Sequence, residues 1–209
     1  MAHHEAGHAL VRLHSPHAVP LHRVTIVPRG VAALGYTMHL PKEDRYMQTR
    51  SELNDELAAA LGGRAAEEVV FGHVSTGAAN DFQQATRIAT AMVKHYGMSE
   101  LGLVAYDDDN GQPQFLRQIM GGPPQYSERT AAEIDRQVRT IITSTYDRVL
   151  KILREQKPTL ERIATTLLER ESISGDELNQ FAADAAPRAD RFGGPAATDD
   201  DAQDDRQAL

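Results

Sequence analysis

The spacing of apolar residues along the chain predicts mostly helices. The segment HHEAGHALVRLH at residues 3–14 has a helical pattern and stops at a Ser-Pro pair. Thr49 and Glu52 have the spacing of a capping box, so a longer helix is expected to begin there. Its apolar positions are Leu53, Leu57, Ala60, Leu61, Ala65 and Val69. Gly62 and Gly63 lie within this helix, where we expect another backbone to approach closely.

The rest of the chain is also predicted to be largely helical. After a loop at residues 72–80, a helix ends at Gly97. Its apolar face is formed by Phe82, Ala85, Ala89, Met92, Val93 and Tyr96. A long helix is expected from about Ser127 to Gln156, where Pro158 stops it, and a further helix follows to about Glu169.

Ser174 and Glu177 have capping-box spacing and predict a last short helix. Residues 22–40 alone have the β-branched, alternating pattern of two short strands, and residues 98–126 read as a long irregular connection. The expected fold is therefore mainly α with a small β element of two to three short strands. We expect one domain over residues 1–186 and a disordered acidic tail over residues 187–209.

Composition narrows the possible functions. The chain has 209 residues, a net charge of −8 and no cysteine, which excludes disulfides and thiolate metal sites. No dense run of Lys and Arg is present, so no nucleic-acid partner is expected. No apolar run approaches the length needed to cross a bilayer, and we therefore expect this polypeptide itself to be soluble.

The strongest chemical signal is His4-Glu5-Ala6-Gly7-His8, which fits the H-E-x-x-H pattern of zinc peptidases. Residues four apart lie on one helix face, so His4 and His8 can bind one metal ion. Glu5 lies about 100° around the helix, where its carboxylate can act on the attacking water as a general base. We expect His3, His14, His17 and His22 to be surface residues and not ligands.

A catalytic zinc site needs a third protein ligand, and the residues alone leave its identity open. Asp81 follows the STGAAN turn at the start of a helix, and Glu67 and Glu68 lie in the preceding helix. An acidic residue in a first helical turn commonly stabilises the helix dipole, whereas glutamates on a helix face are commonly solvated.

Several further blocks resemble the peptidase domain of the FtsH-type ATP-dependent zinc proteases. In chain order they are HEAGHAL, LGYTMHLPKEDR, LGGRAAEEVVFG, VSTGAANDFQQAT, MVKHYGMSELG and LLERESISGDEL. The resemblance covers about residues 3–180. It implies that His4 and His8 are zinc ligands, that Glu5 is the catalytic base, and that Asp81 is the third ligand. Glu67 and Glu68 would then support the site from outside the ligand set.

The resemblance also implies where a substrate binds. Ala33, Leu34, Gly35 and Tyr36 are similar to the family's β-edge beside the active site. An edge strand presents unpaired N–H and C=O groups to which an extended peptide can add as a further strand.

The family resemblance implies one Zn²⁺ per subunit, a homo-hexamer, and unfolded or membrane proteins as substrates. ATP would be used only by an ATPase domain that is not part of this sequence, and membrane contact would be made only through N-terminal segments also missing here. The parent protein is expected in the bacterial inner membrane, with its peptidase domain facing the cytoplasm.

Two other hypotheses remain. The predicted metal helix starts at the beginning of the sequence, so its first turn could be poorly held. The chain could then be a truncated zinc-binding assembly module, inactive without its N-terminal ATPase part. Alternatively, it could be a helical regulatory protein in which the H-E-x-x-H pattern is coincidental.

Overall fold

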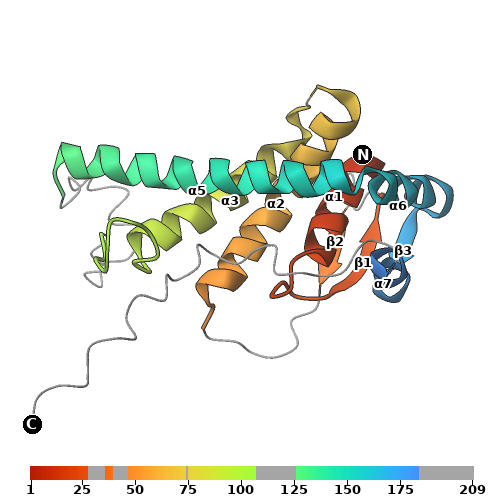
Figure 1. Ribbon diagram of the computed structural model, residues 1–209, viewed down its shortest axis with the longest axis horizontal. Helices are drawn as coiled ribbons and strands as arrows, with labels where there is room; N and C mark the ends of the chain where they lie inside the picture. The colour runs from red at the N-terminus through yellow and green to blue at the C-terminus, as the bar shows by residue number, and fades with distance from the viewer. Residues whose placement is uncertain (28–35, 40–46, 74, 107–125, 184–209) are drawn as a thin grey trace, which may run out of the picture.

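A computed structural model describes residues 1–27, 36–39, 47–73, 75–106 and 126–183 of the chain, and the side chains of residues 36–39 are not described. Helices dominate this part and confirm the mainly α prediction (Figure 1). The helices are α1 Ala2–Leu13, α2 Arg50–Phe71, α3 Ala79–Lys94, α5 Glu128–Glu155, α6 Lys157–Arg170 and α7 Gly175–Ala183, with a 3₁₀ turn η1 at Thr76–Ala78. The strands are β1 Leu21–Thr25, β2 Tyr36–His39 and β3 Ser172–Ser174.

Helix α1 lies at the centre of the core, in contact with α2 and α6. Ala6, Ala9, Leu10 and Val11 are fully buried in one cluster that includes residues of α2, α5, α6 and α7. The first turn is also well held, contrary to our expectation, since Ala2 is only 4% exposed. Small residues let neighbouring elements approach α1 closely, and this packing explains why so short a helix is stable.

Helix α2 begins and ends as the sequence predicts. The amide of Glu52 donates to Thr49 Oγ1, and the amide of Thr49 donates to Glu52 Oε2, which completes the capping box. Gly72 ends the helix with a φ of +68°, a conformation that glycine adopts without strain. Near the start of α2, buried Asp55 accepts a hydrogen bond from the amide of His17 at 2.8 Å, which ties the turn after α1 to α2.

The close backbone approach predicted at the glycine pair is confirmed. A Cβ on Gly62 would lie 2.7 Å from the carbonyl oxygen of Gly7, and a Cβ on Gly7 would collide with the Gly62 carbonyl. The two helices therefore cross backbone to backbone at this point. Only glycine permits such a crossing without a shift of one helix.

The β element is a three-stranded antiparallel sheet in the order β2-β1-β3. Strands β1 and β2 confirm the pair expected within residues 22–40. Strand β3 comes from the far end of the sequence, and buried Val24 of β1 pairs with buried Ile173 of β3. Strand β2 occupies an edge of this sheet, since β1 is its one partner among the described strands.

Helix α5 extends along one side of the molecule, with α2 and α3 inclined against it, while α6, α7 and the sheet lie together towards its C-terminal end (Figure 1). Pro158 lies in the first turn of α6, where its missing N–H costs nothing. The amide of Glu177 donates to Ser174 Oγ, so the predicted cap of α7 is also present.

Several local predictions are wrong. Phe82 and Tyr96 are 41% and 54% exposed, because α3 buries only a narrow stripe centred on Ala85 and Ala89. His14 is buried and its Nδ1 donates to the carbonyl of Leu10, so it is not a surface residue. The predicted loop at residues 72–80 contains the turn η1, and α3 already begins at Ala79.

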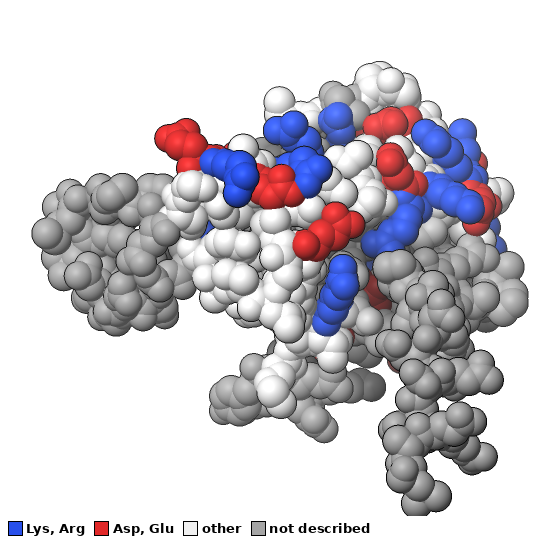
Figure 2. Space-filling model, turned by 60° about the vertical axis from the view of Figure 1, so that its left-hand side comes forward, with Lys and Arg blue, Asp and Glu red and all other residues white. Residues whose placement is uncertain are grey.

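Some predictions fall on residues outside the described ranges. These are the tail at residues 187–209 and most of the irregular connection, residues 107–125. Among the described helices, none combines the length and the apolar character that a bilayer span requires. On the face drawn in Figure 2, acidic and basic side chains lie interspersed, so neither sign dominates there.

Glu171 ends α6 with a φ of +61°, in the left-handed region that a residue with a Cβ adopts at a cost. Its side chain is exposed. Glu171→Gly should therefore raise the free energy of unfolding by about 0.5–1 kcal/mol, the relief of strain less the added entropy of the unfolded chain. Thermal unfolding should show a midpoint about 1–3 °C higher. Glu171→Ala is the control and should give no increase; a lower midpoint for the glycine variant would contradict the prediction.

Candidate metal centre

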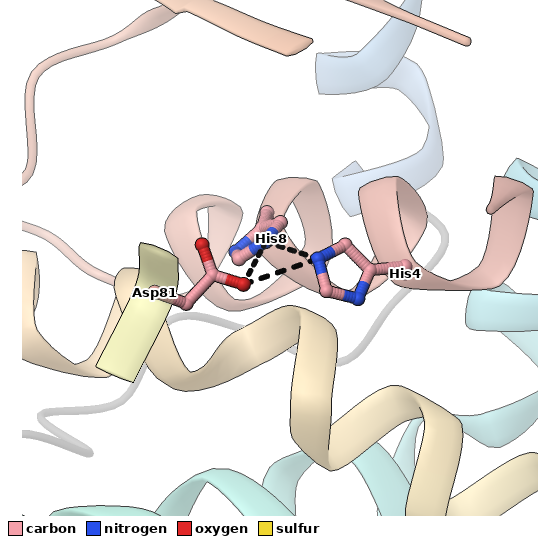
Figure 3. A group of neighbouring side chains, drawn as sticks. All are labelled: His4, His8 and Asp81. Atoms are coloured by element: carbon pink, nitrogen blue, oxygen red, sulfur yellow. Dashed lines mark hydrogen bonds and ion pairs between the residues drawn. The ribbon is translucent and has the colours of Figure 1, made fainter. Parts of the chain in front are cut away.

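Two histidines of α1 converge on one point. His4 and His8 are separated by one helical turn, and their Nε2 atoms lie 3.1 Å apart. Figure 3 shows the two rings side by side on the same face of α1, with their nitrogens directed towards a common space. Both side chains are largely buried, at 10% and 14% exposed.

Asp81 reaches the same point from the first turn of α3. Its Oδ2 lies 3.1 Å from Nε2 of His4 and 3.5 Å from Nε2 of His8 (Figure 3). Oδ2 is buried and accepts no hydrogen bond of normal geometry. Among the described residues, His4, His8 and Asp81 form the one group of three or more His, Cys, Asp or Glu side chains that could hold a metal ion.

The opposite nitrogen of each imidazole is held by α2. Nδ1 of His8 donates to the carbonyl oxygen of Ala59 at 2.7 Å, and Nδ1 of His4 donates to Oε1 of Glu67 at 3.0 Å. Because both acceptors require a hydrogen on Nδ1, the neutral form of each ring has its lone pair on Nε2. Two lone pairs and a carboxylate oxygen thus face one another, an arrangement that a bound cation would stabilise.

Glu67 connects His4 to the segment that leads to Asp81. It is 9% exposed and accepts hydrogen bonds from the amide of Ser75 at 3.0 Å and from Ser75 Oγ at 3.1 Å. Burial acts to raise the pKa of Glu67, but the hydrogen bonds from Ser75 and His4 outweigh it and hold that pKa below its usual range. Glu67 therefore remains a carboxylate. The neighbouring Glu68 instead accepts a hydrogen bond from Tyr146.

The electrostatics of the three converging side chains favour an ionised Asp81. Burial acts to raise the pKa of Asp81, but the contacts with His4 and His8 dominate and hold it well below its usual range. For His4, burial acts to lower the pKa, and Asp81, Glu5 and Glu67 together raise it. This region thus offers a concentrated negative charge beside two imidazoles, and it would attract a cation.

Glu5 lies next to His4 on α1 and is 6% exposed. Its charge contributes to the raised pKa of His4. Of the expected substrate edge, Ala33, Leu34 and Gly35 lie outside the described residues. Tyr36 begins β2, and its backbone pairs with Thr25 at the edge of the sheet.

The sequence and its family resemblance predicted the three converging residues but not the glycine that leaves room for them. A Cβ built on Gly63 would lie 2.5 Å from Nε2 of His4 and 2.5 Å from Nε2 of His8. Only a residue without a side chain leaves these nitrogens accessible. The glycine pair within a helix signalled close packing, but nothing in the sequence indicated that Gly63 faces the imidazoles.

Comparisons with known proteins identify relatives of this chain. The sequence profile of peptidase family M41 matches residues 1–181. The chain is 50% identical over 182 residues to the ATP-dependent zinc metalloprotease FtsH of Thermotoga maritima, which covers 87% of this chain and 30% of that protein. It is 46% identical over 201 residues to the FtsH of Burkholderia pseudomallei, covering 94% of this chain and 30% of that protein. The chain thus spans less than a third of the length of these relatives.

Replacing Gly63 should weaken Zn²⁺ binding without weakening the helix. Gly63→Ala improves helix propensity by about 1 kcal/mol, but its Cβ pushes the imidazoles of His4 and His8 apart. We expect the dissociation constant for Zn²⁺, measured by competition with a chromophoric chelator, to rise at least about tenfold.

Gly102→Ala is the matched control for this experiment. Gly102 has a φ of +88° and open space around its missing Cβ, so its replacement strains the fold away from the metal centre. It should lower the thermal midpoint and leave the Zn²⁺ affinity unchanged. Equal Zn²⁺ affinity in Gly63→Ala and the wild type would contradict the prediction.

Proposed function

This chain belongs to peptidase family M41, and on that premise we propose that it is the zinc-dependent endopeptidase domain of an ATP-dependent, membrane-anchored protease. The convergence of His4, His8 and Asp81 from α1 and α3 carries this proposal. The matched relatives, which are named ATP-dependent zinc metalloproteases, support both the metal and the reaction.

The side chains fit a tetrahedral zinc ion with three protein ligands. Zn–N and Zn–O bonds of about 2.0–2.1 Å in tetrahedral geometry separate neighbouring ligand atoms by about 3.3 Å. The three separations among the Nε2 atoms and Asp81 Oδ2 are 3.1, 3.1 and 3.5 Å. We propose one Zn²⁺ per chain, held by His4, His8 and Asp81, with the fourth position left for water or substrate.

Glu5 acts as the general base in this proposal. A bound zinc ion would lower the pKa of a coordinated water to about 7 and polarise the scissile carbonyl. Glu5 takes a proton from the attacking water and then delivers it to the leaving amine. Its position one residue after His4, about 100° around the helix, would direct its carboxylate towards the attacking water and not into the ligand set.

The same proposal assigns the substrate to the edge of the sheet. An extended peptide would pair with the backbone of Ala33, Leu34, Gly35 and Tyr36 as an added strand. The edge position of β2, which begins at Tyr36, supports this assignment. Backbone pairing tolerates many sequences, which suits an enzyme that degrades unfolded or misassembled proteins.

The remaining functions of the whole protein would come from parts that the longer relatives contain. We propose that the domain works as a homo-hexamer, that ATP is consumed only by a separate ATPase domain, and that the parent lies in the bacterial inner membrane with this domain facing the cytoplasm. The substrates would be unfolded proteins and membrane proteins. The closed ring would enclose the sites, so that only unfolded chains could reach them.

The ligand assignment predicts an order of metal affinities. Asp81→Ala removes a ligand and should raise the Zn²⁺ dissociation constant at least about 100-fold. Glu67→Ala removes no ligand but the hydrogen bonds to His4 and Ser75, and it should raise the constant about tenfold. Chelator competition measures both values, and metal analysis of the purified variants gives the stoichiometry. The opposite order would transfer the ligand role to Glu67.

Glu5→Gln tests the catalytic step separately from metal binding. The amide keeps the shape of the side chain but cannot take a proton, so hydrolysis of a fluorescently labelled, loosely folded protein should fall about 10²–10⁴-fold. Zinc content should remain near one ion per chain. Glu169→Gln, at an exposed position of α6, is the matched control and should keep full activity.

Two outcomes would count against the proposal. Equal hydrolysis by wild type and Glu5→Gln would remove Glu5 from the mechanism. Zinc binding by the wild-type chain without any chelator-sensitive hydrolysis would favour the assembly-module hypothesis.

A further inference from the structure

The segment from Ser75 to Phe82 determines where Asp81 points. It contains the turn η1 and the first residues of α3, and no side chain caps the start of α3. Asp81 contacts the two histidines, but they are its partners in the metal centre and do not hold the segment that carries it. The direction of its carboxylate therefore depends on how the 75–82 segment is held.

Helix α2 holds the beginning of this segment. Glu67 accepts two hydrogen bonds from Ser75, one from the amide and one from the hydroxyl, while its Oε1 also accepts the Nδ1 hydrogen of His4. One carboxylate of α2 thus fixes both a metal-facing imidazole and the start of the segment that leads to Asp81.

The end of the segment is held from α2 as well. The guanidinium of Arg64 lies over the ring of Phe82, 5.8 Å from its centroid, within the range of a cation–π contact. Arg64 precedes Glu67 by three residues, so both side chains project from the same side of α2. Phe82 directly follows Asp81 in the sequence. Glu67 and Arg64, one turn apart on α2, therefore hold the two ends of the segment.

Arg64 also interacts with Tyr146 of α5. Burial and Glu68 raise the pKa of Tyr146 to about 12, and Arg64 opposes this increase. The hydroxyl of Tyr146 donates to Oε2 of Glu68 at 2.8 Å. Arg64 therefore lies at a junction of α2, α3 and α5, with both a ring and a polar group to orient it.

We propose that Arg64 is a positioning residue for the metal centre: by holding Phe82, it sets the rotation of the first turn of α3 and directs the Asp81 carboxylate towards His4 and His8. The inference rests on the proposed zinc site and adds a determinant of its affinity. Phe82 is 41% exposed, so its ring contributes little to the core, and its contact with Arg64 acts on orientation more than on stability.

The test is a double-mutant cycle on metal affinity. Arg64→Met and Phe82→Leu each remove the cation–π contact and keep an apolar side chain of similar length. Each should raise the Zn²⁺ dissociation constant about three- to fivefold, in keeping with a contact at a partly exposed site. The Zn²⁺ dissociation constant of the double variant should lie within about twofold of that of either single variant, because both changes remove the same interaction. Arg64→Lys keeps the charge and should recover part of the affinity.

The visible absorption spectrum of the cobalt-substituted protein provides a second measurement. A misdirected Asp81 alters the ligand geometry, so the visible d–d absorption of the Co²⁺ forms of Arg64→Met and Phe82→Leu should change in the same way. Arg162→Met is the matched control, since Arg162 lies 5.1 Å over the ring of Phe181 between α6 and α7. It should leave both the Zn²⁺ affinity and the Co²⁺ spectrum unchanged.

Two results would overturn this inference. One is wild-type Zn²⁺ affinity and Co²⁺ spectrum in Arg64→Met with only a lowered thermal midpoint, which would make Arg64 a packing residue. The other is multiplicative effects in the double variant, which would show that Arg64 and Phe82 act independently. Absence of Zn²⁺ binding by the wild-type chain would instead refute the proposed function, so the two failures are distinguishable.

Discussion

The metal centre depends on the distance at which α2 crosses α1. At Gly7 and Gly62 the two backbones touch, and one residue later Gly63 lies against the Nε2 atoms of both histidines. A larger residue at any of these positions would separate the helices and lengthen every contact between them. The hydrogen bonds from His8 to Ala59 and from His4 to Glu67 would then be lost, since such bonds weaken steeply within a few tenths of an ångström.

This crossing makes α2 the scaffold of the site although it supplies no residue to the converging group. Its backbone orients His8, its Glu67 orients His4 and holds Ser75, and its Arg64 lies over Phe82 beside Asp81. Such an arrangement places the supporting groups on one rigid helix, and the supported groups lie on α1 and α3. Because α1 and α3 both pack against α2, their motion relative to each other is restrained.

The converging side chains are stabilised by a positive charge among them. The nitrogens of His4 and His8 and the carboxylate of Asp81 meet in a largely buried space, and their contacts lower the pKa of Asp81 and raise that of His4. A bound cation would supply the positive charge in place of a proton, so metal affinity and fold stability would be coupled in the proposed site. The apolar packing of α1, with Ala6, Ala9 and Leu10 fully buried, holds the helix that carries both histidines.

The sequence by itself determined what depends on neighbours along the chain. The caps at the starts of α2 and α7, formed by Thr49 and Ser174, depend on contacts between residues three apart. The pairing of His4 with His8 likewise follows from their spacing of four residues. Sequence also indicated close packing at the glycine pair, but not its partner. Strand β3, the burial of His14 and the exposure of Phe82 escaped prediction because each depends on elements distant in sequence.

Only the tertiary structure decided which carboxylate lies at which nitrogen. Asp81, Glu67 and Glu68 were equivalent candidates from residue chemistry alone, and the resemblance to a family was needed to prefer one. In the fold, Asp81 lies at Nε2 of both histidines, Glu67 lies at Nδ1 of His4, and Glu68 faces Tyr146. The physical reason is that these positions are set by the crossing of α1 and α2 and by the path from Ser75 to Phe82, which no local pattern encodes.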